Sequence, residues 1–146
     1  MKKAIAGVAV FFLMGMVAVW QSDFGKAREK AKKENKYILL SFSGSDWCIP
    51  CIRTKKEIFD KEPFGHFADT SLILVNADFP RLKKDALTTA QTRENEALAE
   101  QFNKDGTFPL TILLDPNGTV VKEWKGYPNM SPQNFVDQIK SVEHSH

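Results

Sequence analysis

Cys48 and Cys51 are the only two cysteines in this chain of 146 residues, and they form a C-x-x-C motif. Two thiols at this spacing can close one small disulfide that opens and reforms by thiol–disulfide exchange. Thiolates also bind soft metal ions such as copper(I) and zinc where further ligands lie nearby. The motif therefore predicts either redox chemistry or metal binding.

The segments around the motif favour redox chemistry. Residues 37–42 form an apolar run typical of a strand buried on both faces, and a helical pattern begins at Cys48 and ends before Pro63. A cysteine at a helix N-terminus is stabilised as thiolate by unpaired backbone N–H groups and by the helix dipole. We therefore expect Cys48 to be the nucleophile. Cys51, one turn along and more deeply set, would resolve the mixed disulfide.

Further strands and helices complete a single domain without repeats. Apolar runs predict a strand at 72–77, parallel to the first, and a hairpin of strands 110–114 and 119–124 around the turn 115–118. Helices are expected from a cap at Ser22 or Asp23 to about residue 35, at 94–103, and from Ser131 onward. The side chains expected to face inward from the helices are Phe24, Ala27, Ala31, Ile52, Ile58, Phe59, Leu98, Phe102, Phe135, Ile139 and Val142.

This order of elements, with W-C-x-x-C at the first strand-to-helix turn and Phe108–Pro109 just before the hairpin, resembles the thioredoxin family over residues 37–142. Residues 44–48, 76–78 and 107–109 look most like the exported thioredoxin-like thiol:disulfide proteins of bacteria. The resemblance implies an α/β, thioredoxin-like fold: a central mixed sheet of about four strands, flanked by helices, with an extra N-terminal helix. It also implies an oxidoreductase whose catalytic residues are Cys48 and Cys51.

The resemblance assigns roles to residues around the cysteines. Pro109 would be the family's cis-proline, facing the cysteine pair and presenting its backbone to an extended substrate. Phe108 would line the substrate groove and Trp47 would cap the surface of the active site. The alternative for both aromatic residues is an ordinary place in the core, and we favour the functional roles.

Ile49 and Pro50, the two residues between the cysteines, are expected to tune the redox potential. Pro50 suits an early helix position and stiffens the turn between the sulfur atoms. Family members with proline before the second cysteine tend to be reductants, and Ile49 adds no charge that would stabilise the thiolate further. We therefore expect a moderately lowered Cys48 pKa and a potential near the reducing end of the family range of about −270 to −120 mV.

The chain departs from the thioredoxin pattern in three places. The buried acid that assists the resolving cysteine is absent, because Ser41 and Phe42 occupy the strand before the motif. The lysine often paired with that acid has no counterpart at 72–77. Asp46 is expected to cap a helix rather than replace the acid. The connection 79–93 is longer than in a minimal thioredoxin, and we interpret it as a solvated extra turn rather than a partner-docking helix.

The N-terminus has the layout of an export signal. Lys2 and Lys3 precede an unbroken apolar stretch at 4–20, but its end fits signal peptidase poorly. We therefore divide the chain into a signal peptide or membrane anchor at 1–22 and a thioredoxin-like domain at 23–146. The domain would be periplasmic or tethered to the outer face of the cytoplasmic membrane. Five basic residues at 26–33 oppose this orientation under the positive-inside rule.

The composition and the expected location limit the classes of partner. With 20 basic and 18 acidic residues the net charge is only +2, so no nucleic-acid partner is expected. The expected partners are cysteine-containing protein substrates and a membrane electron donor, because no soluble NADPH system operates outside the cytoplasm. Contact with the membrane would occur only through 4–20 if uncleaved. We expect a monomer without cofactor or metal beyond the Cys48–Cys51 disulfide.

Two other classes of function stay open. A copper or zinc delivery protein would need a histidine beside the cysteines, but His66 is expected in a loop, and His144 and His146 in a frayed tail. A non-catalytic module would keep the fold to bind partners, with the cysteines idle. A changed first cysteine would favour that module, and the chain retains Cys48.

Overall fold

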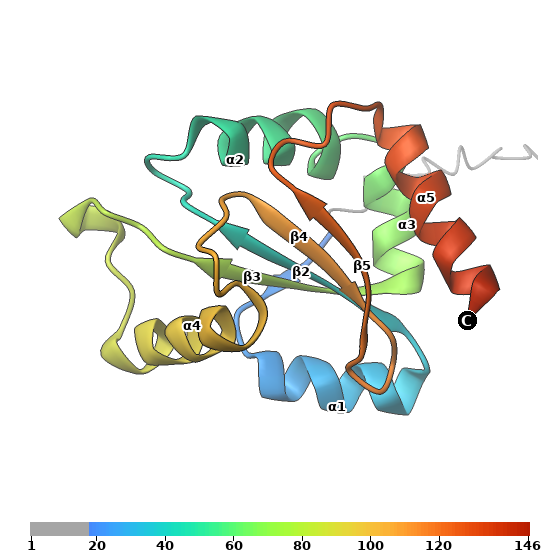
Figure 1. Cartoon of the computed structure of the whole chain (residues 1–146), viewed down its shortest axis with the longest axis horizontal. Coiled ribbons are helices and arrows are strands. Elements are labelled where there is room, and N and C mark those ends of the chain that lie inside the picture. The colour runs from blue at the N-terminus through green and yellow to red at the C-terminus, as the bar shows by residue number, and fades with distance from the viewer. Residues whose placement is uncertain (1–17) are drawn as a thin grey trace, which may run out of the picture.

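The computed structural model describes residues 18–146, which form a five-stranded mixed sheet flanked by helices on both faces (Figure 1). The strand order is β1-β3-β2-β4-β5. The strands β1, β3 and β2 run parallel, whereas β4 is antiparallel to β2 and to β5. The strands span Trp20–Gln21 (β1), Tyr37–Ser43 (β2), Leu72–Asp78 (β3), Leu110–Leu114 (β4) and Val120–Lys125 (β5).

The helices divide between the two faces of the sheet. The helices α1 and α4 cover one face, and α2, α3 and α5 lie on the other (Figure 1). Each face has its own apolar core, so the central strand β2 is buried on both sides, with Leu40 in one core and Leu39 in the other. The helical segments span Phe24–Glu34 (α1), Ile49–Thr54 (α2), Lys55–Phe59 (a π-helical turn, η1), Phe64–Ser71 (α3), Lys83–Asp85 (a 3₁₀ turn, η2), Thr89–Phe102 (α4) and Pro132–Ser145 (α5).

Local signals in the sequence explain the ends of these helices. The Asp23 carboxylate accepts a hydrogen bond from the Lys26 backbone N–H at 2.9 Å and so caps α1, while Asn35 ends that helix in the left-handed conformation. Ser131 caps α5 in the same way, with Pro132 at its first position. The expectations for these two helices are confirmed, including the buried face of α1.

Four features differ from the expectations. The strand β1 adds Trp20 and Gln21 to the sheet, because Trp20 pairs with Leu74 and its ring lies 5.0 Å from that of Phe59. This strand belongs to the folded unit although it precedes residue 23. The export stretch up to residue 17 lies outside the described residues.

The helix α3 was not predicted, and it places His66 in a helix rather than a loop. The helix α4 begins at Thr89, five positions before the predicted start, because the Thr88 hydroxyl caps it through the Gln91 N–H. Ile52 was expected to face inward but is 41% exposed. The face of α2 that meets the sheet is taken by Cys51 and Thr54, which leaves Ile52 at the surface.

None of the helices within residues 18–146 combines the length and the apolar character that crossing a membrane requires.

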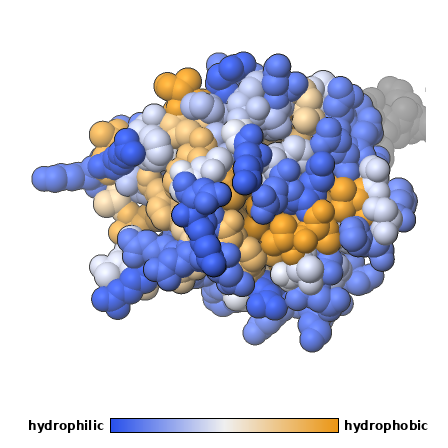
Figure 2. Space-filling view, in the orientation of Figure 1, coloured by the Kyte–Doolittle hydropathy of each residue, from blue (hydrophilic) through white to orange (hydrophobic). Residues whose placement is uncertain are grey.

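Hydrophobic side chains also reach the surface near the motif. Figure 2 shows hydrophobic surface among hydrophilic side chains at the end of the molecule where α2 begins. Of five large hydrophobic side chains exposed in the described chain, Ile49 and Ile52 belong to α2 and Leu82 follows β3.

Candidate active site

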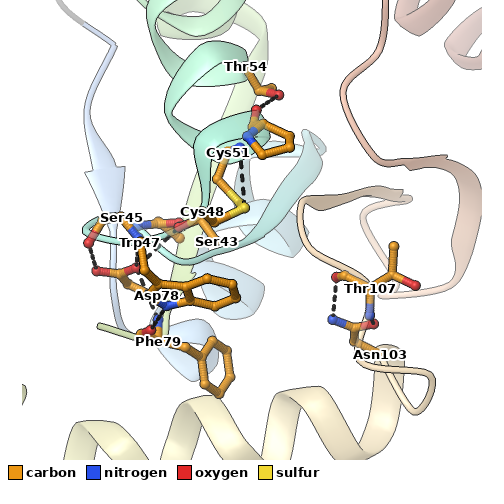
Figure 3. The surroundings of a disulfide bond; sticks show 12 residues. Ser43, Ser45, Trp47, Cys48, Cys51, Thr54, Asp78, Phe79, Asn103 and Thr107 are labelled. Atoms are coloured by element: carbon orange, nitrogen blue, oxygen red, sulfur yellow. Dashed lines mark hydrogen bonds between the residues drawn. A yellow bond between two sulfur atoms is a disulfide. The ribbon is translucent and has the colours of Figure 1, made fainter. Parts of the chain in front are cut away.

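The two cysteines form a disulfide at the N-terminus of α2, with their Cα atoms 5.2 Å apart (Figure 3). Cys48 is the N-cap residue, and its Sγ accepts a hydrogen bond from the Cys51 backbone N–H at 3.3 Å. The same N–H would stabilise a thiolate at Cys48. Cys51 was expected to be the more deeply set thiol, yet Cys48 is 4% exposed and Cys51 5%. Position on the helix therefore distinguishes the two thiols, and burial does not.

Gly44 creates the tight turn that delivers Cys48 to the helix. Its carbonyl accepts a hydrogen bond from the Cys48 N–H at 2.9 Å, and the Trp47 indole lies directly over its Cα. A Cβ at this position would lie 2.3 Å from Cε2 of Trp47, so only glycine allows this packing. The strand end, the turn and the first cysteine are therefore fixed as one unit.

The residues between the cysteines lie at the surface. Pro50 is in the first turn of α2, where no partner is required for the missing N–H. Its carbonyl accepts a hydrogen bond from the buried Thr54 hydroxyl at 2.8 Å. The Ile49 side chain is 67% exposed and covers the outer side of the motif. Neither residue brings a charge to the sulfur atoms.

The Phe108–Pro109 peptide bond is cis, as the resemblance implied. The buried Pro109 lines the same cavity as Cys51, and its carbonyl accepts a hydrogen bond from the Gly126 N–H at 2.8 Å. The Asn103 side chain donates to the Thr107 carbonyl and accepts from the Thr107 N–H, both at 2.9 Å (Figure 3). Asn103 thus holds the loop that enters the cis-proline.

Sequence reasoning missed Asn103. Its position directly after a helix, a few residues before the Phe108–Pro109 step, was the available signal, but an asparagine there is also a common helix ending. The Asn103 side chain is only 5% exposed, and its amide NH2 and C=O groups both bond to the backbone of Thr107. These contacts show that Asn103 positions the loop.

An aromatic cluster joins the motif to the cis-proline loop. The Trp47 and Phe108 rings meet edge to face at 5.6 Å, and Phe108 meets Phe79 in the same way at 5.4 Å. The Trp47 Nε1–H donates to the Phe79 carbonyl at 2.7 Å (Figure 3). Trp47 and Phe108 are both half-buried, so each packs partly against neighbours and presents part of its ring to solvent.

Asp46 has a different task from the one expected. It does not cap α2, since Cys48 holds that position. Its carboxylate accepts hydrogen bonds from the backbone N–H groups of Arg81, at 2.9 and 3.1 Å, and of Leu82, at 2.8 Å. These bonds, that of Arg81 above all, lower the pKa of Asp46. Asp46 therefore fastens the connection after β3 to the turn that carries the motif.

A cavity of about 260 Å³ opens beside Cys51 between α2 and the sheet. Ser41, Ser43 and Asn76 provide polar atoms in its wall, and the Ser43 hydroxyl donates to the Asn76 side chain at 2.9 Å. The lining contains no Asp or Glu. Buried Ser41 thus lies where the resemblance led us to look for an acid, and Lys55 is the one charged residue in the cavity lining.

A second polar cluster lies on the exposed side of α2. The Arg53 guanidinium donates to both Glu57 carboxylate oxygens, at 3.1 and 3.2 Å, and lies 4.2 Å over the Tyr127 ring. The Tyr127 hydroxyl also donates to Glu57. The hydrogen bonds from Arg53, and then from Tyr127, lower the pKa of Glu57, while the bond to Glu57 raises that of Tyr127. The cluster joins α2 to the loop after β5.

Residues 18–146 bring no three His, Cys, Asp or Glu side chains together as a metal site. His66 lies on α3, and His144 is in the last turn of α5 rather than in a frayed tail.

Comparison with known proteins agrees with this architecture. The thioredoxin-like domain family matches residues 24–143. The chain belongs to the thioredoxin-like family. It is 33% identical over 123 residues to the disulfide bond reductase DsbH of Chlamydia pneumoniae, an alignment that covers 84% of this chain and 71% of DsbH. A solved structure of a DsbH oxidoreductase superposes with a TM-score of 0.77 at 31% identity, covering 86% of this chain and 84% of that one.

A more distant relative is the thioredoxin-related protein DsbJ of Chlamydia pneumoniae, 26% identical over 127 residues. That match covers 87% of this chain but only 36% of DsbJ, so the chain spans about a third of that relative. The family, the fold and the Cys48–Cys51 disulfide together make the chain a thiol:disulfide oxidoreductase.

Proposed function

We propose that this chain is an exported disulfide reductase that acts on cysteine-containing proteins. The observation that carries the proposal is the Cys48–Cys51 disulfide at a helix N-terminus, in a common cavity wall with cis-Pro109. The similarity to a protein named disulfide bond reductase supports the reductive direction. The uncharged Ile49-Pro50 pair supports it too, since no residue between the cysteines adds to the stabilisation of the thiolate.

The reaction follows from the positions of the two sulfur atoms. In the reduced protein, the Cys48 thiolate attacks one sulfur of a substrate disulfide, and the S–S bond breaks as the other substrate sulfur leaves as thiolate. Cys51 then loses its proton and attacks Cys48 Sγ in the mixed disulfide, which releases the second substrate thiolate. The substrate gains two electrons, and the protein is left with the Cys48–Cys51 disulfide seen in the structure.

The surrounding residues bind and orient the substrate in this proposal. Pro109 presents the backbone of its loop beside the disulfide, while Phe108 and Trp47 provide the half-exposed aromatic wall. Ile49 and Pro50 set the potential. A membrane-bound donor must return two electrons to the disulfide after each cycle, because the reaction consumes the dithiol.

The export of the domain rests on the N-terminal sequence. Lys2 and Lys3 followed by the apolar stretch 4–20 fit a signal peptide or a membrane anchor. The full chain, produced in a Gram-negative host, should be digested by protease added to spheroplasts. The mass of the product distinguishes cleavage from anchoring, and complete protection would contradict export.

The reductase activity is tested by potential and by trapping. The soluble fragment from residue 18 should equilibrate with thiol buffers at about −250 mV or below, read by the fluorescence of Trp47 beside the disulfide. A value near about −120 mV would make the protein an oxidant. Cys48→Ser should abolish reduction of peptide disulfides. Cys51→Ser should accumulate mixed disulfides, and a Cys51→Ser variant that traps no substrate would contradict the division of roles.

A further inference from the structure

The connection from Phe79 to Thr88, here called the strap, is a basic and exposed segment beside the active site. It carries Arg81, Lys83 and Lys84 against one acid, Asp85, and all four side chains are exposed. Figure 2 shows hydrophilic side chains projecting, next to hydrophobic surface, at the end of the molecule where Figure 1 draws the segment between β3 and α4. The strap thus combines positive charge with an exposed apolar side chain, Leu82.

The strap is fastened to the residues that precede the nucleophilic cysteine. Asp46 accepts its hydrogen bonds from the strap's Arg81 and Leu82 backbone, and Trp47 donates its indole N–H to the Phe79 carbonyl at 2.7 Å. The backbone of the strap is therefore held by the side chains one and two positions before Cys48. An exposed loop held at several points in this way has a defined position relative to the disulfide.

Arg81 is the basic residue of the strap that contacts the residue before Cys48. Its guanidinium lies 3.6 Å above the centre of the Trp47 ring, a cation–π contact that keeps the charge beside the motif. No salt bridge within residues 18–146 includes Arg81. The carboxylate of Asp46 is occupied by backbone N–H groups, and Asp85 lies beside Asp46. A guanidinium stacked by one face still has its N–H edges available for a carboxylate.

We propose that Arg81 selects substrates in which an acidic side chain lies within a few residues of the reactive cysteine. This inference rests on the proposed reductase function. The occupant is an extended segment of a protein disulfide, with Asp or Glu one to three positions from its cysteine. Three extended residues span about 10 Å, so a segment with its cysteine at Cys48 can carry its carboxylate to the guanidinium stacked on the neighbouring Trp47. Ile49, next to Cys48, and Leu82, next to Arg81, add exposed apolar side chains at the two ends of such a segment.

The test uses three disulfide peptides that differ only in the residues flanking one cysteine: Asp, Asn or Lys. The reduced protein is mixed with each peptide, and kcat/KM is measured at low and high salt. The wild-type protein should reduce the Asp peptide about fivefold faster than the Lys peptide at low ionic strength, and salt should shrink this ratio. Arg81→Glu should invert the ratio, whereas Arg81→Lys should keep most of it.

A matched control separates a local effect from net charge. Lys140→Glu makes the same change of two charges on α5, at the other end of the molecule from the strap (Figure 1). It should leave the Asp-to-Lys ratio unchanged. An equal loss of the ratio in Lys140→Glu would overturn the proposal, as would a wild-type ratio of one or an Arg81→Glu variant with the wild-type ratio.

The Asn peptide distinguishes the two proposals. If the wild-type protein reduces none of the three peptides, the reductase function fails. If it reduces the Asn peptide and shows no preference between Asp and Lys, only the role of Arg81 fails. Because the ratio is measured within each variant, a change in folding or in potential that affects all peptides equally does not alter it.

Discussion

Two arginines lie on aromatic rings on different elements around the disulfide, and they differ in what neutralises them. Arg53, on α2, stacks on Tyr127 and is held by both carboxylate oxygens of Glu57. Arg81, on the strap, stacks on Trp47, and no acidic side chain of the described residues pairs with it in a salt bridge. The paired arginine fixes one protein segment to another, and the unpaired one keeps its donors for a ligand.

The two aromatic rings, Trp47 and Tyr127, also differ in what they contact. Trp47 contacts Gly44, Phe79 and Phe108, and so it couples the motif, the strap and the cis-proline loop. Tyr127 contacts Arg53 on α2 and Glu57 on η1, at the exposed side of this helical segment. Perturbing the Trp47 side should therefore affect catalysis, while perturbing the Tyr127 side should affect the local stability of α2.

The largest effect is expected from Trp47→Ala. This change removes a half-buried ring and its hydrogen bond to Phe79, so we expect a loss of about 2–3 kcal/mol in the free energy of unfolding together with a large fall in kcat/KM. Denaturant unfolding and peptide reduction measure both. Tyr127→Ala is the counterpart and should lower activity much less. Equal losses of activity in the two variants would break the distinction between the two sides.

Gly44→Ala should have the next largest effect. The added Cβ would overlap the Trp47 indole, so the ring must move although the residue is still a tryptophan. We expect reduced peptide turnover and an altered Trp47 fluorescence in the oxidised protein. Gly25→Ala, on α1, is the glycine control, because its added Cβ would meet only the Asp23 carboxylate, at 3.4 Å. Unchanged fluorescence in Gly44→Ala would show that the ring position is not restricted.

Asp46→Ala should have a smaller and more selective effect. Without the carboxylate, the Arg81 and Leu82 N–H groups lose their acceptor. The strap then keeps its bonds at Phe79, whose carbonyl accepts from Trp47 and whose N–H donates to the Ser43 carbonyl. We expect faster hydrogen exchange at these two amides and a lower preference for acidic peptides. Since the pKa of Asp46 is lowered, acidification should imitate the variant only below the ordinary pKa of an aspartate. Unchanged exchange would contradict the anchoring role.

The smallest effect is expected from Glu57→Gln, on the Tyr127 side. Because the pKa of Glu57 is lowered in the folded protein, its contribution to stability is present above the unfolded pKa and is lost as pH falls through the folded pKa. The stability of Glu57→Gln should therefore not include the part that the wild-type protein loses as the pH falls through the pKa of Glu57. The variant should also show the wild-type ratio of Asp-peptide to Lys-peptide reduction. Denaturant unfolding midpoints measured over a series of pH values test the change in stability. A changed ratio would mean that both arginines take part in selection.

The elements that the sequence predicted well are those with local signals. The cap at Asp23, the Ser131-Pro132 start of α5 and the Asp115–Gly118 turn each depend on hydrogen bonds within a few residues. The helix α3 was missed because its N-cap residue is Pro63, which ended the preceding helix in the prediction and has no side chain that could accept a capping hydrogen bond. Ile52 was misplaced because an apolar residue at a functional surface has the same type as one in a core.

By itself the sequence determined the redox pair, the strand–turn–helix that carries it and the thioredoxin-like order of elements, because these depend on residue type and short-range spacing. Only the tertiary structure decided that Asn103 holds the loop before Pro109, that Asp46 anchors the strap and that Arg81 lies on Trp47. These contacts join segments far apart in the chain or within irregular loops, where partners are set by packing rather than by periodicity.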